Sequence, residues 1–275
     1  MKPIDPSTKT IPAILTIAGS DCSAGAGLQA DLKTFQHFGI HGLTAVTCIV
    51  SETANIVRRV DPVDPSLLED QILLMLDSFP LEVVKTGMLG SAKHVSCVAE
   101  IFRSHPHIKL IIDPVMIAST GTSLIEPDAI FTYREKLLPL AHLITPNLPE
   151  AETLLGKKIP SVDEMSRAAK FLSEEFGCAV LLKGGHLESK DCTDLLYDGQ
   201  SEHRFTSPRL AVQASHGTGC TLAAAIAANL AKGRDLTGAV SMAKEYLNDC
   251  LKNSYRFVNS SGKVVHALNQ GTDFQ

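Results

Sequence analysis

Two glycine-rich segments carry residue types that can bind an anion. The first runs from Gly19 to Gly27 and leads into a predicted helix, and the second is His216-Gly-Thr-Gly-Cys-Thr221, before a run of small residues. Glycines let backbone N–H groups approach a ligand, and the dipole of a following helix favours negative charge. We therefore expect an anion hole suited to phosphate in the second segment, built from Gly217, Thr218, Gly219 and Cys220.

Cys220 falls in the first turn of the helix that follows the second segment. The positive end of a helix dipole lowers the pKa of a thiol, so the sequence predicts a thiolate that can act as a base. Two alternatives stay open, namely a buried cysteine that only packs and a cysteine hydrolase that uses His216 or His186. The sequence has no serine-hydrolase GxSxG elbow, and the first segment lacks the Lys-Ser/Thr ending of a P-loop.

Oxygen-bearing side chains form a third group, in Asn147-Leu-Pro-Glu150 and at Asp113, with Lys183 nearby in the predicted sheet. Carboxylates and amides suit Mg²⁺, which prefers oxygen ligands and keeps several waters. Lys183 supplies a point charge for phosphate. The alternative for Asn147 and Glu150 is an N-cap that opens the next helix, and capping does not exclude metal binding.

Short apolar runs alternate with amphipathic stretches along the chain, which predicts one α/β domain over residues 1–275, with its core at about 13–252 and loose ends of about a dozen residues. The expected strands are Ile14–Ala18, Leu43–Val50, Leu81–Lys85, Leu110–Ile112, His142–Ile144 and Ala179–Leu182. The expected helices are Leu28–Phe38, Ser66–Ser78, Ala92–Ser104, Pro127–Leu137, Glu150–Leu155, Val162–Phe176, Thr221–Lys232 and Leu236–Lys252. Asp198-Gly199 indicates a hairpin. The runs suit a buried parallel sheet, whose polar strand exits gather at one edge.

Composition narrows the class of protein. The 275 residues include 25 basic and 30 acidic side chains, so the formal charge is 25 − 30 = −5. This balance argues against nucleic-acid binding, which needs a basic surface. No apolar run is long enough for a membrane span, and the start of the chain has no secretory signal pattern, so we expect a cytoplasmic protein. The seven scattered cysteines predict reduced thiols rather than a disulfide framework.

Six motifs taken together resemble the hydroxymethylpyrimidine/phosphomethylpyrimidine kinase family of thiamine biosynthesis, within the ribokinase-like superfamily. They occur in order between about residues 13 and 252. The motifs are AGSDCSAGAGLQADLKT (18–34), KTGML (85–89), DPVM (113–116), TPNLPEAE (145–152), KGGH (183–186) and HGTGCT (216–221). One such motif recurs by chance, but six in register are specific.

The resemblance implies a three-layer ribokinase-like α/β fold with a mostly parallel sheet, a homodimer, and ATP- and Mg²⁺-dependent phosphorylation. The implied substrates are 4-amino-5-hydroxymethyl-2-methylpyrimidine and its monophosphate. Residues carried over to the pyrimidine are Gly19, Ala26, Asp31, Val50, Glu52, Met88 and Val115. Residues carried over to the nucleotide, metal and reaction are Asp113, Asn147, Glu150, Lys183, Gly217, Thr218, Gly219 and Cys220. In this branch of the superfamily, cysteine is typical at position 220, where the wider superfamily has an aspartate base.

The main departure from the family is Glu52, where the family usually has glutamine within AQNT and this chain has Ser-Glu-Thr-Ala. An ionised carboxylate only accepts hydrogen bonds, whereas an amide also donates. Either a ring nitrogen or Glu52 must therefore carry a proton, or the preferred substrate differs. Cys22 and Ala24, which replace a common proline and glycine, are minor departures.

Three alternative functions remain at this point. A pyridoxine or pyridoxal kinase has the same fold, and a non-catalytic relative keeps only the pyrimidine site. A nicotinamide dehydrogenase is weakly suggested by Gly25, Gly27 and Glu52, but its third glycine position holds Ala30 and it leaves HGTGCT without a role.

Overall fold

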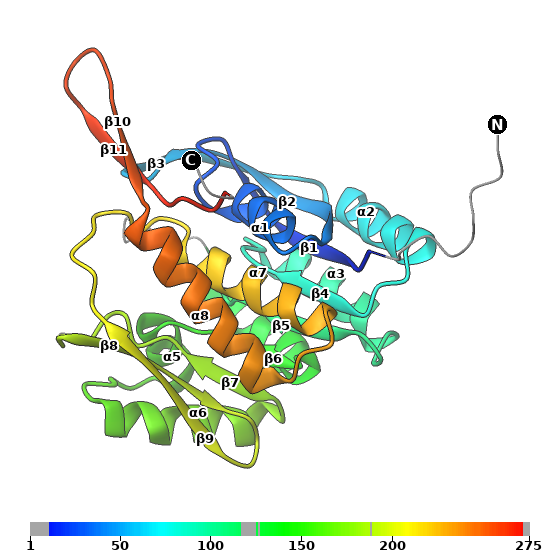
Figure 1. The fold of residues 1–275 in the computed structure, drawn as a ribbon. Coiled ribbons are helices and arrows are strands. Elements are labelled where there is room, and N and C mark those ends of the chain that lie inside the picture. Colours follow the sequence, from blue (N-terminus) through cyan, green and yellow to red (C-terminus); the bar gives the residue numbers. More distant parts are fainter. Residues whose placement is uncertain (1–10, 117–124, 126, 188, 272–275) are drawn as a thin grey trace, which may run out of the picture.

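The computed structural model describes residues 11–116, 125, 127–187 and 189–271. Its main sheet has nine strands in the order β3-β2-β1-β4-β5-β6-β7-β8-β9 (Figure 1). The strands are β1 (Ala13–Asp21), β2 (His41–Thr53), β3 (Ile56–Pro62), β4 (Val83–Thr86), β5 (Lys109–Ile112), β6 (Leu143–Ile144), β7 (Ala179–Leu182), β8 (Asp191–Tyr197) and β9 (Glu202–Pro208). Strands β10 (Tyr255–Val258) and β11 (Val264–Ala267) form a separate hairpin.

Six neighbouring strands, in the spatial order β2-β1-β4-β5-β6-β7, pair in parallel. Their apolar side chains are buried on both alternating positions, as in Val83–Thr86 and Ala179–Leu182, because helices cover both faces. The antiparallel strands lie at the two edges, β3 beside β2 and the β8–β9 hairpin beside β7. The exits of the parallel strands therefore meet at one edge of the sheet, as the sequence predicts.

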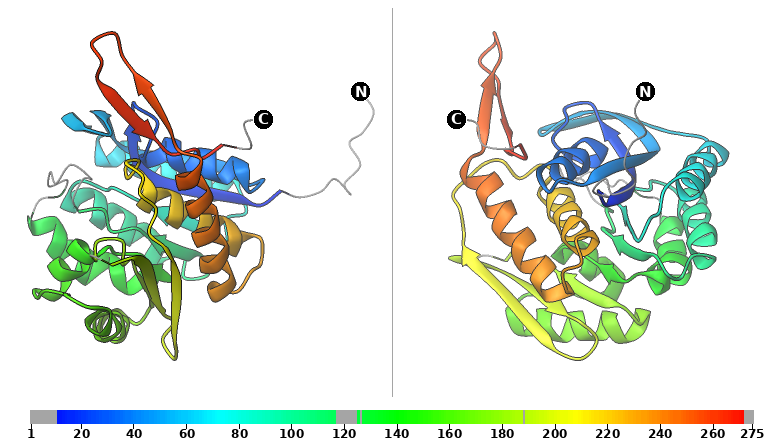
Figure 2. Two further views of the ribbon diagram at one scale, coloured as in Figure 1. Left: turned by 60° about the vertical axis from the view of Figure 1, so that its left-hand side comes forward. Right: turned by 45° about the vertical axis from the view of Figure 1, so that its right-hand side comes forward.

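The helices divide into two layers that enclose separate apolar cores (Figure 2). One layer contains α2 (Pro65–Ser78), α3 (Ala92–Arg103), α4 (Pro127–Thr132), α5 (Leu148–Leu155) and α6 (Val162–Phe176). The other contains α1 (Gly27–His37), α7 (Thr218–Ala231) and α8 (Leu236–Lys252). Helix α7 is buried from Thr221 to Leu230, and its alanines let it pack closely between the sheet and α8. This arrangement confirms the predicted three-layer α/β fold.

Four features differ from the sequence prediction. Strand β3 and the β10–β11 hairpin were not expected, and the predicted helix over 127–137 changes to a π-helical turn at Tyr133–Leu137. The expected loose ends also differ. Residues 1–10 and 272–275 lie outside the described part of the chain, but β11 is ordered and Leu268 and Gln270 are each 2% exposed. Among the described residues, no helix combines the length and apolarity needed to span a membrane.

Candidate active site

The N-terminus of α7 lies against the strand exits and has no side-chain cap. Its N-cap, Gly217, has φ +81°, and a Cβ there would lie 1.9 Å from the Gly25 carbonyl oxygen, so this position accepts only glycine. The two glycine-rich segments are thus in contact. A Cβ at Gly219 would lie 3.1 Å from Lys183 Nζ and 3.4 Å from Asp113 Oδ2. The N-terminal N–H groups of α7 therefore lie beside the charged side chains of Lys183 and Asp113.

Asp113 and Lys183 form that pair at the exits of β5 and β7. Lys183 Nζ donates to Asp113 Oδ1 at 2.8 Å, and Thr145 Oγ1 donates to the same oxygen at 3.1 Å. Burial alone would lower the pKa of Lys183, but the carboxylates of Asp113 and Glu150 raise it. Lys183 therefore stays charged beside the α7 N-terminus, where it can bind an anion.

Asn147 and Glu150 form the predicted cap at the start of α5. Asn147 Oδ1 accepts from the Glu150 N–H at 2.9 Å, and Glu150 Oε2 accepts from the Asn147 N–H at 2.8 Å, which is a complete capping box. Glu150 is 2% exposed, and burial raises its pKa to about 7, although Lys183 opposes this. A bound divalent cation favours the ionised form of such a carboxyl.

These oxygens fit Mg²⁺ in the way that Mg²⁺ usually binds to proteins. Asp113 Oδ2 has no hydrogen bond among those of the described residues, and the Glu150 carboxylate accepts only from the backbone N–H groups of Asn147 and Met116 within that part of the chain. One or two carboxylates with nucleotide phosphates and water make a common Mg²⁺ shell. We therefore regard Asp113 and Glu150 as the residues able to hold the cation.

Cys220 lies in the first turn of α7 and is partly exposed. Burial raises its pKa to about 11, although the charge of Lys85 and the Gly27 N–H lower it. The sequence-based expectation of a lowered pKa is therefore wrong, because loss of hydration outweighs the favourable end of the helix. All seven cysteines are free thiols, as predicted.

A fully buried ion pair lies close to Cys220. Lys85 Nζ contacts the two Asp31 carboxylate oxygens at 3.0 and 2.7 Å, and Thr16 Oγ1 donates to Asp31 Oδ2 at 2.6 Å. Burial alone would lower the pKa of Lys85, but the Asp31 carboxylate raises it. Asp31 is 0% exposed, so the structure places it in this pair and not on an open surface facing a substrate. The sequence signal for Lys85 is a lysine inside an apolar strand.

Among the residues carried over to the pyrimidine, Gly19, Val50 and Met88 lie together, and Ala26 and Val115 have other partners. A Cβ at Gly19 would lie 2.8 Å from Cys48 Sγ and 3.7 Å from both Met88 Sδ and Val50 Cγ2, so these four residues form one cluster. Ala26 is the N-cap of α1, and its N–H donates to Asp21 Oδ2 at 2.8 Å. Val115 follows Asp113, and its N–H donates to the Asp113 carbonyl at 2.8 Å. No described contact joins Val115 to the Gly19 cluster.

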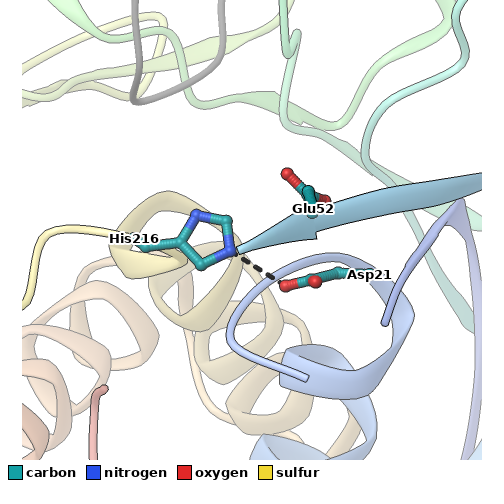
Figure 3. Close-up of side chains that lie close together, drawn as sticks. All are labelled: Asp21, Glu52 and His216. Carbon is teal, nitrogen blue, oxygen red and sulfur yellow. Dashed lines mark hydrogen bonds and ion pairs between the residues drawn. The ribbon is translucent and has the colours of Figure 1, made fainter. Parts of the chain in front are cut away.

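Asp21, His216 and Glu52 bring the first segment, the second segment and the end of β2 together (Figure 3). His216 Nε2 lies 2.9 Å from Asp21 Oδ2, which also accepts from the Ala26, Gly25 and Ser23 donors. Burial opposes ionisation of Asp21, but these hydrogen bonds lower its pKa to about 2. The three side chains are within 4.8 Å of one another, yet the Asp21 oxygen is already saturated with donors, so we assign the group to loop positioning rather than metal binding.

Glu52 stands apart from the Asp21–His216 bond in Figure 3, although it belongs to the same group of side chains. The Cys22 thiol makes two hydrogen bonds to the Glu52 backbone: its Sγ donates to the Glu52 carbonyl and accepts from the Glu52 N–H. Burial and the negative charge of Asp21 raise the pKa of Glu52, while His216 lowers it. The sequence did not reveal the Asp21–His216 pair, since 195 positions separate the two residues.

The chain is similar to known proteins over most of its length. The chain is 41% identical over 256 residues to a thiamine biosynthesis bifunctional protein of Geobacter sulfurreducens, covering 93% of this chain and 52% of that relative. It is 40% identical to a hydroxymethylpyrimidine/phosphomethylpyrimidine kinase of Rhizobium meliloti, covering 90% of this chain and 94% of the relative. The chain therefore spans about half the length of the bifunctional relative.

Among solved structures, a pyridoxal kinase of Staphylococcus aureus in complex with AMP-PCP and pyridoxal superposes with a TM-score of 0.85 at 35% identity, covering 96% of this chain and 94% of that one. The family described as phosphomethylpyrimidine kinase matches residues 21–265. With that match over most of its length, the chain belongs to the phosphomethylpyrimidine kinase family of phosphotransferases.

Proposed function

We propose that this protein transfers the γ-phosphoryl group of ATP to the hydroxymethyl oxygen of 4-amino-5-hydroxymethyl-2-methylpyrimidine, and then phosphorylates the monophosphate to the diphosphate. The observation that carries the proposal is the uncapped N-terminus of α7 beside the Asp113–Lys183 pair. Phosphoryl transfer needs positioned charge more than covalent help, and this arrangement supplies it.

The nucleotide phosphates would lie between the first turn of α7 and Lys183. The N–H groups of Gly219 and Cys220 have no partner within the helix at this end and can donate to phosphate oxygens, whereas the Thr218 N–H donates to the Ser215 carbonyl at 3.4 Å and would have to exchange that bond for one to phosphate. Mg²⁺, held by Asp113 and Glu150, would neutralise charge on those oxygens. Asn147 keeps Glu150 in place through the capping box.

Cys220 is the candidate base for the hydroxymethyl proton. Its pKa of about 11 means that the thiol is mostly protonated at neutral pH, and Lys85 and the Gly27 N–H favour the small thiolate fraction. Since the alcohol loses its proton late in transfer, a weakly populated base is compatible with turnover. The other catalytic contribution is positioning, because Cys220 belongs to the same helical turn as the anion-binding N–H groups.

Glu52 bears on the choice between pyrimidine and pyridoxal. A protonated Glu52 offers one donor and one acceptor, which is the pattern of the glutamine amide it replaces. Its raised pKa and its place beside Asp21 favour that form. Pyridoxal kinase activity is the second candidate, favoured by the likeness to the Staphylococcus aureus structure.

The test is ADP release by purified protein with Mg-ATP and, separately, hydroxymethylpyrimidine, its monophosphate and pyridoxal. We expect turnover of both pyrimidines, and mass spectrometry should find the mono- and diphosphates. Turnover of pyridoxal alone would refute the pyrimidine assignment and leave the kinase class standing. A homodimer, a cytoplasmic location and a single domain remain predictions, for sedimentation, cell fractionation and limited proteolysis to test.

A further inference from the structure

The segment that follows β11 enters the interior of the protein. Figure 1 shows the chain returning from the hairpin toward α1, and residues 268–271 are named here the C-terminal latch. Leu268 is 2% exposed and belongs to the apolar core around α7 and α8. The Tyr246 hydroxyl donates to the Gln270 carbonyl at 2.9 Å, and the Asn269 N–H donates to the Cys250 carbonyl at 3.3 Å. Helix α8 therefore anchors the latch on one side.

Gln270 links the latch to both glycine-rich segments. Its Nε2 donates to the Gly25 carbonyl at 3.1 Å and to Thr221 Oγ1 at 2.9 Å. Thr221 Oγ1 in turn donates to the Gly217 carbonyl at 2.8 Å, so a chain of hydrogen bonds reaches the N-cap of α7. Both partners of the amide nitrogen act as acceptors, which fixes the orientation of the side chain.

The contact points lie next to reactive positions. Thr221 follows Cys220 in the sequence, and the Gly25 carbonyl packs directly against Gly217. The Gly27 N–H, two residues beyond Gly25, contributes a hydrogen bond to the Cys220 thiol. A shift of one segment relative to the other would therefore change the surroundings of Cys220.

The β10–β11 hairpin also contacts the other side of the candidate site. Asn55 Nδ2, in the turn between β2 and β3, donates to the Val264 carbonyl at 3.2 Å. That turn directly follows Glu52 and Thr53 at the end of β2. The C-terminal residues thus contact both the β1–α1 loop and the β2–β3 turn.

We propose that Gln270 is a positioning residue, which sets the distance between the β1–α1 loop and the first turn of α7 and so fixes Cys220 against the bound substrate. The expected change in pyrimidine kinetics rests on the proposed function. The effect on the Cys220 thiol is independent of any substrate.

The test compares Gln270→Leu, which keeps a side chain of similar size but removes both donors, with the wild-type protein. Gln200→Leu, at an exposed position in the β8–β9 turn, is the matched control. Alkylation of each cysteine by iodoacetamide is followed by peptide mass spectrometry without ligands. Pyrimidine and ATP kinetics are measured in parallel.

With Gln270→Leu, we expect Cys220 to be alkylated several-fold faster, and Cys178, which the latch does not contact, to keep its wild-type rate. The loss of two hydrogen bonds should raise the KM for the pyrimidine roughly tenfold. Gln270→Glu, which keeps the shape but, when ionised, cannot donate to the Gly25 carbonyl, should give the same pattern if the leucine variant folds poorly.

A lower melting temperature with wild-type Cys220 reactivity and wild-type KM would overturn the proposal, since Gln270 would then only contribute to packing. If the wild-type protein phosphorylates no pyrimidine, the proposed function fails, but faster alkylation of Cys220 in Gln270→Leu still supports the latch. Equal alkylation rates in the two proteins refute the latch whatever the substrate.

Discussion

Removal of Lys85 tests the buried ion pair near Cys220. Lys85 and Asp31 are each 0% exposed, and within the described part of the chain Asp31 has one other side-chain donor, Thr16. Lys85→Met would leave the carboxylate buried and almost uncompensated, and breaking such a pair costs about 3–5 kcal/mol of unfolding free energy. Lys85→Met/Asp31→Leu removes both charges, and we expect it to recover to within about 2 kcal/mol of the wild-type protein.

The assay is urea unfolding at pH 7 without ligands. Lys252→Met is the matched control, because Lys252 pairs with Asp249 at 3.2 Å while both side chains are more than half exposed. We expect that control to change stability by less than about 1 kcal/mol. If the double variant were no more stable than Lys85→Met alone, the lost stability would come from packing, and the reasoning about an unpaired charge would be refuted.

Three further predictions concern carboxyl and thiol groups of the site. Cys220→Ala should lose most of kcat and keep pyrimidine affinity. The wild-type kcat should rise with pH below the thiol pKa of about 11, and this rise should be absent in the variant. Steady-state kinetics from pH 7 to 9.5 measure kcat, KM and their pH dependence, and wild-type turnover in the variant would reduce Cys220 to a packing role. Glu52→Gln should retain or improve pyrimidine affinity and weaken its dependence on pH, as calorimetry can measure; a large loss of affinity would contradict the proton assigned to Glu52. Glu150 has a pKa raised by burial to about 7 from 4.5, so the folded state holds the proton more tightly, and the metal-free protein should lose stability as pH rises from about 4.5 to 7. Glu150→Gln should remove about 1–3 kcal/mol of that loss of unfolding free energy, as denaturant titrations at a series of pH values can measure, and an unchanged pH dependence would contradict the assignment.

Periodicity and breaker residues predict most of the secondary structure. Strand β7 and helices α6 and α8 have the predicted limits, because apolar runs, capping serine and aspartate residues, and a following glycine or asparagine define them locally. Strand β3 was missed because all seven of its residues are at least partly exposed, and pairing with β2 stabilises it rather than its own apolar pattern. The same reason applies to β10, whose four residues are exposed.

Local sequence also predicts which segments meet at the site, since strand exits of a parallel sheet share one edge. It does not predict the partners that each side chain finds there. Asp31 pairs with Lys85 across 54 positions, and Gln270 reaches Gly25 across 245 positions. The pKa of Cys220 depends on burial by the whole fold, so its position in the helix alone predicts a lowered pKa where the fold raises it.

Gly219→Ala tests most directly whether the phosphoryl group is held between α7 and the Asp113–Lys183 pair. Gly219 lies in the first turn of α7 without a positive φ, so alanine fits the helix, but its methyl group would lie 3.1 Å from Lys183 Nζ, where we propose that a phosphate binds. We expect folding stability to be kept while single-turnover phosphorylation of the pyrimidine falls by roughly two orders of magnitude or more, the scale set by loss of transition-state charge stabilisation. Wild-type phosphorylation by a folded Gly219→Ala protein would show that the reaction takes place elsewhere.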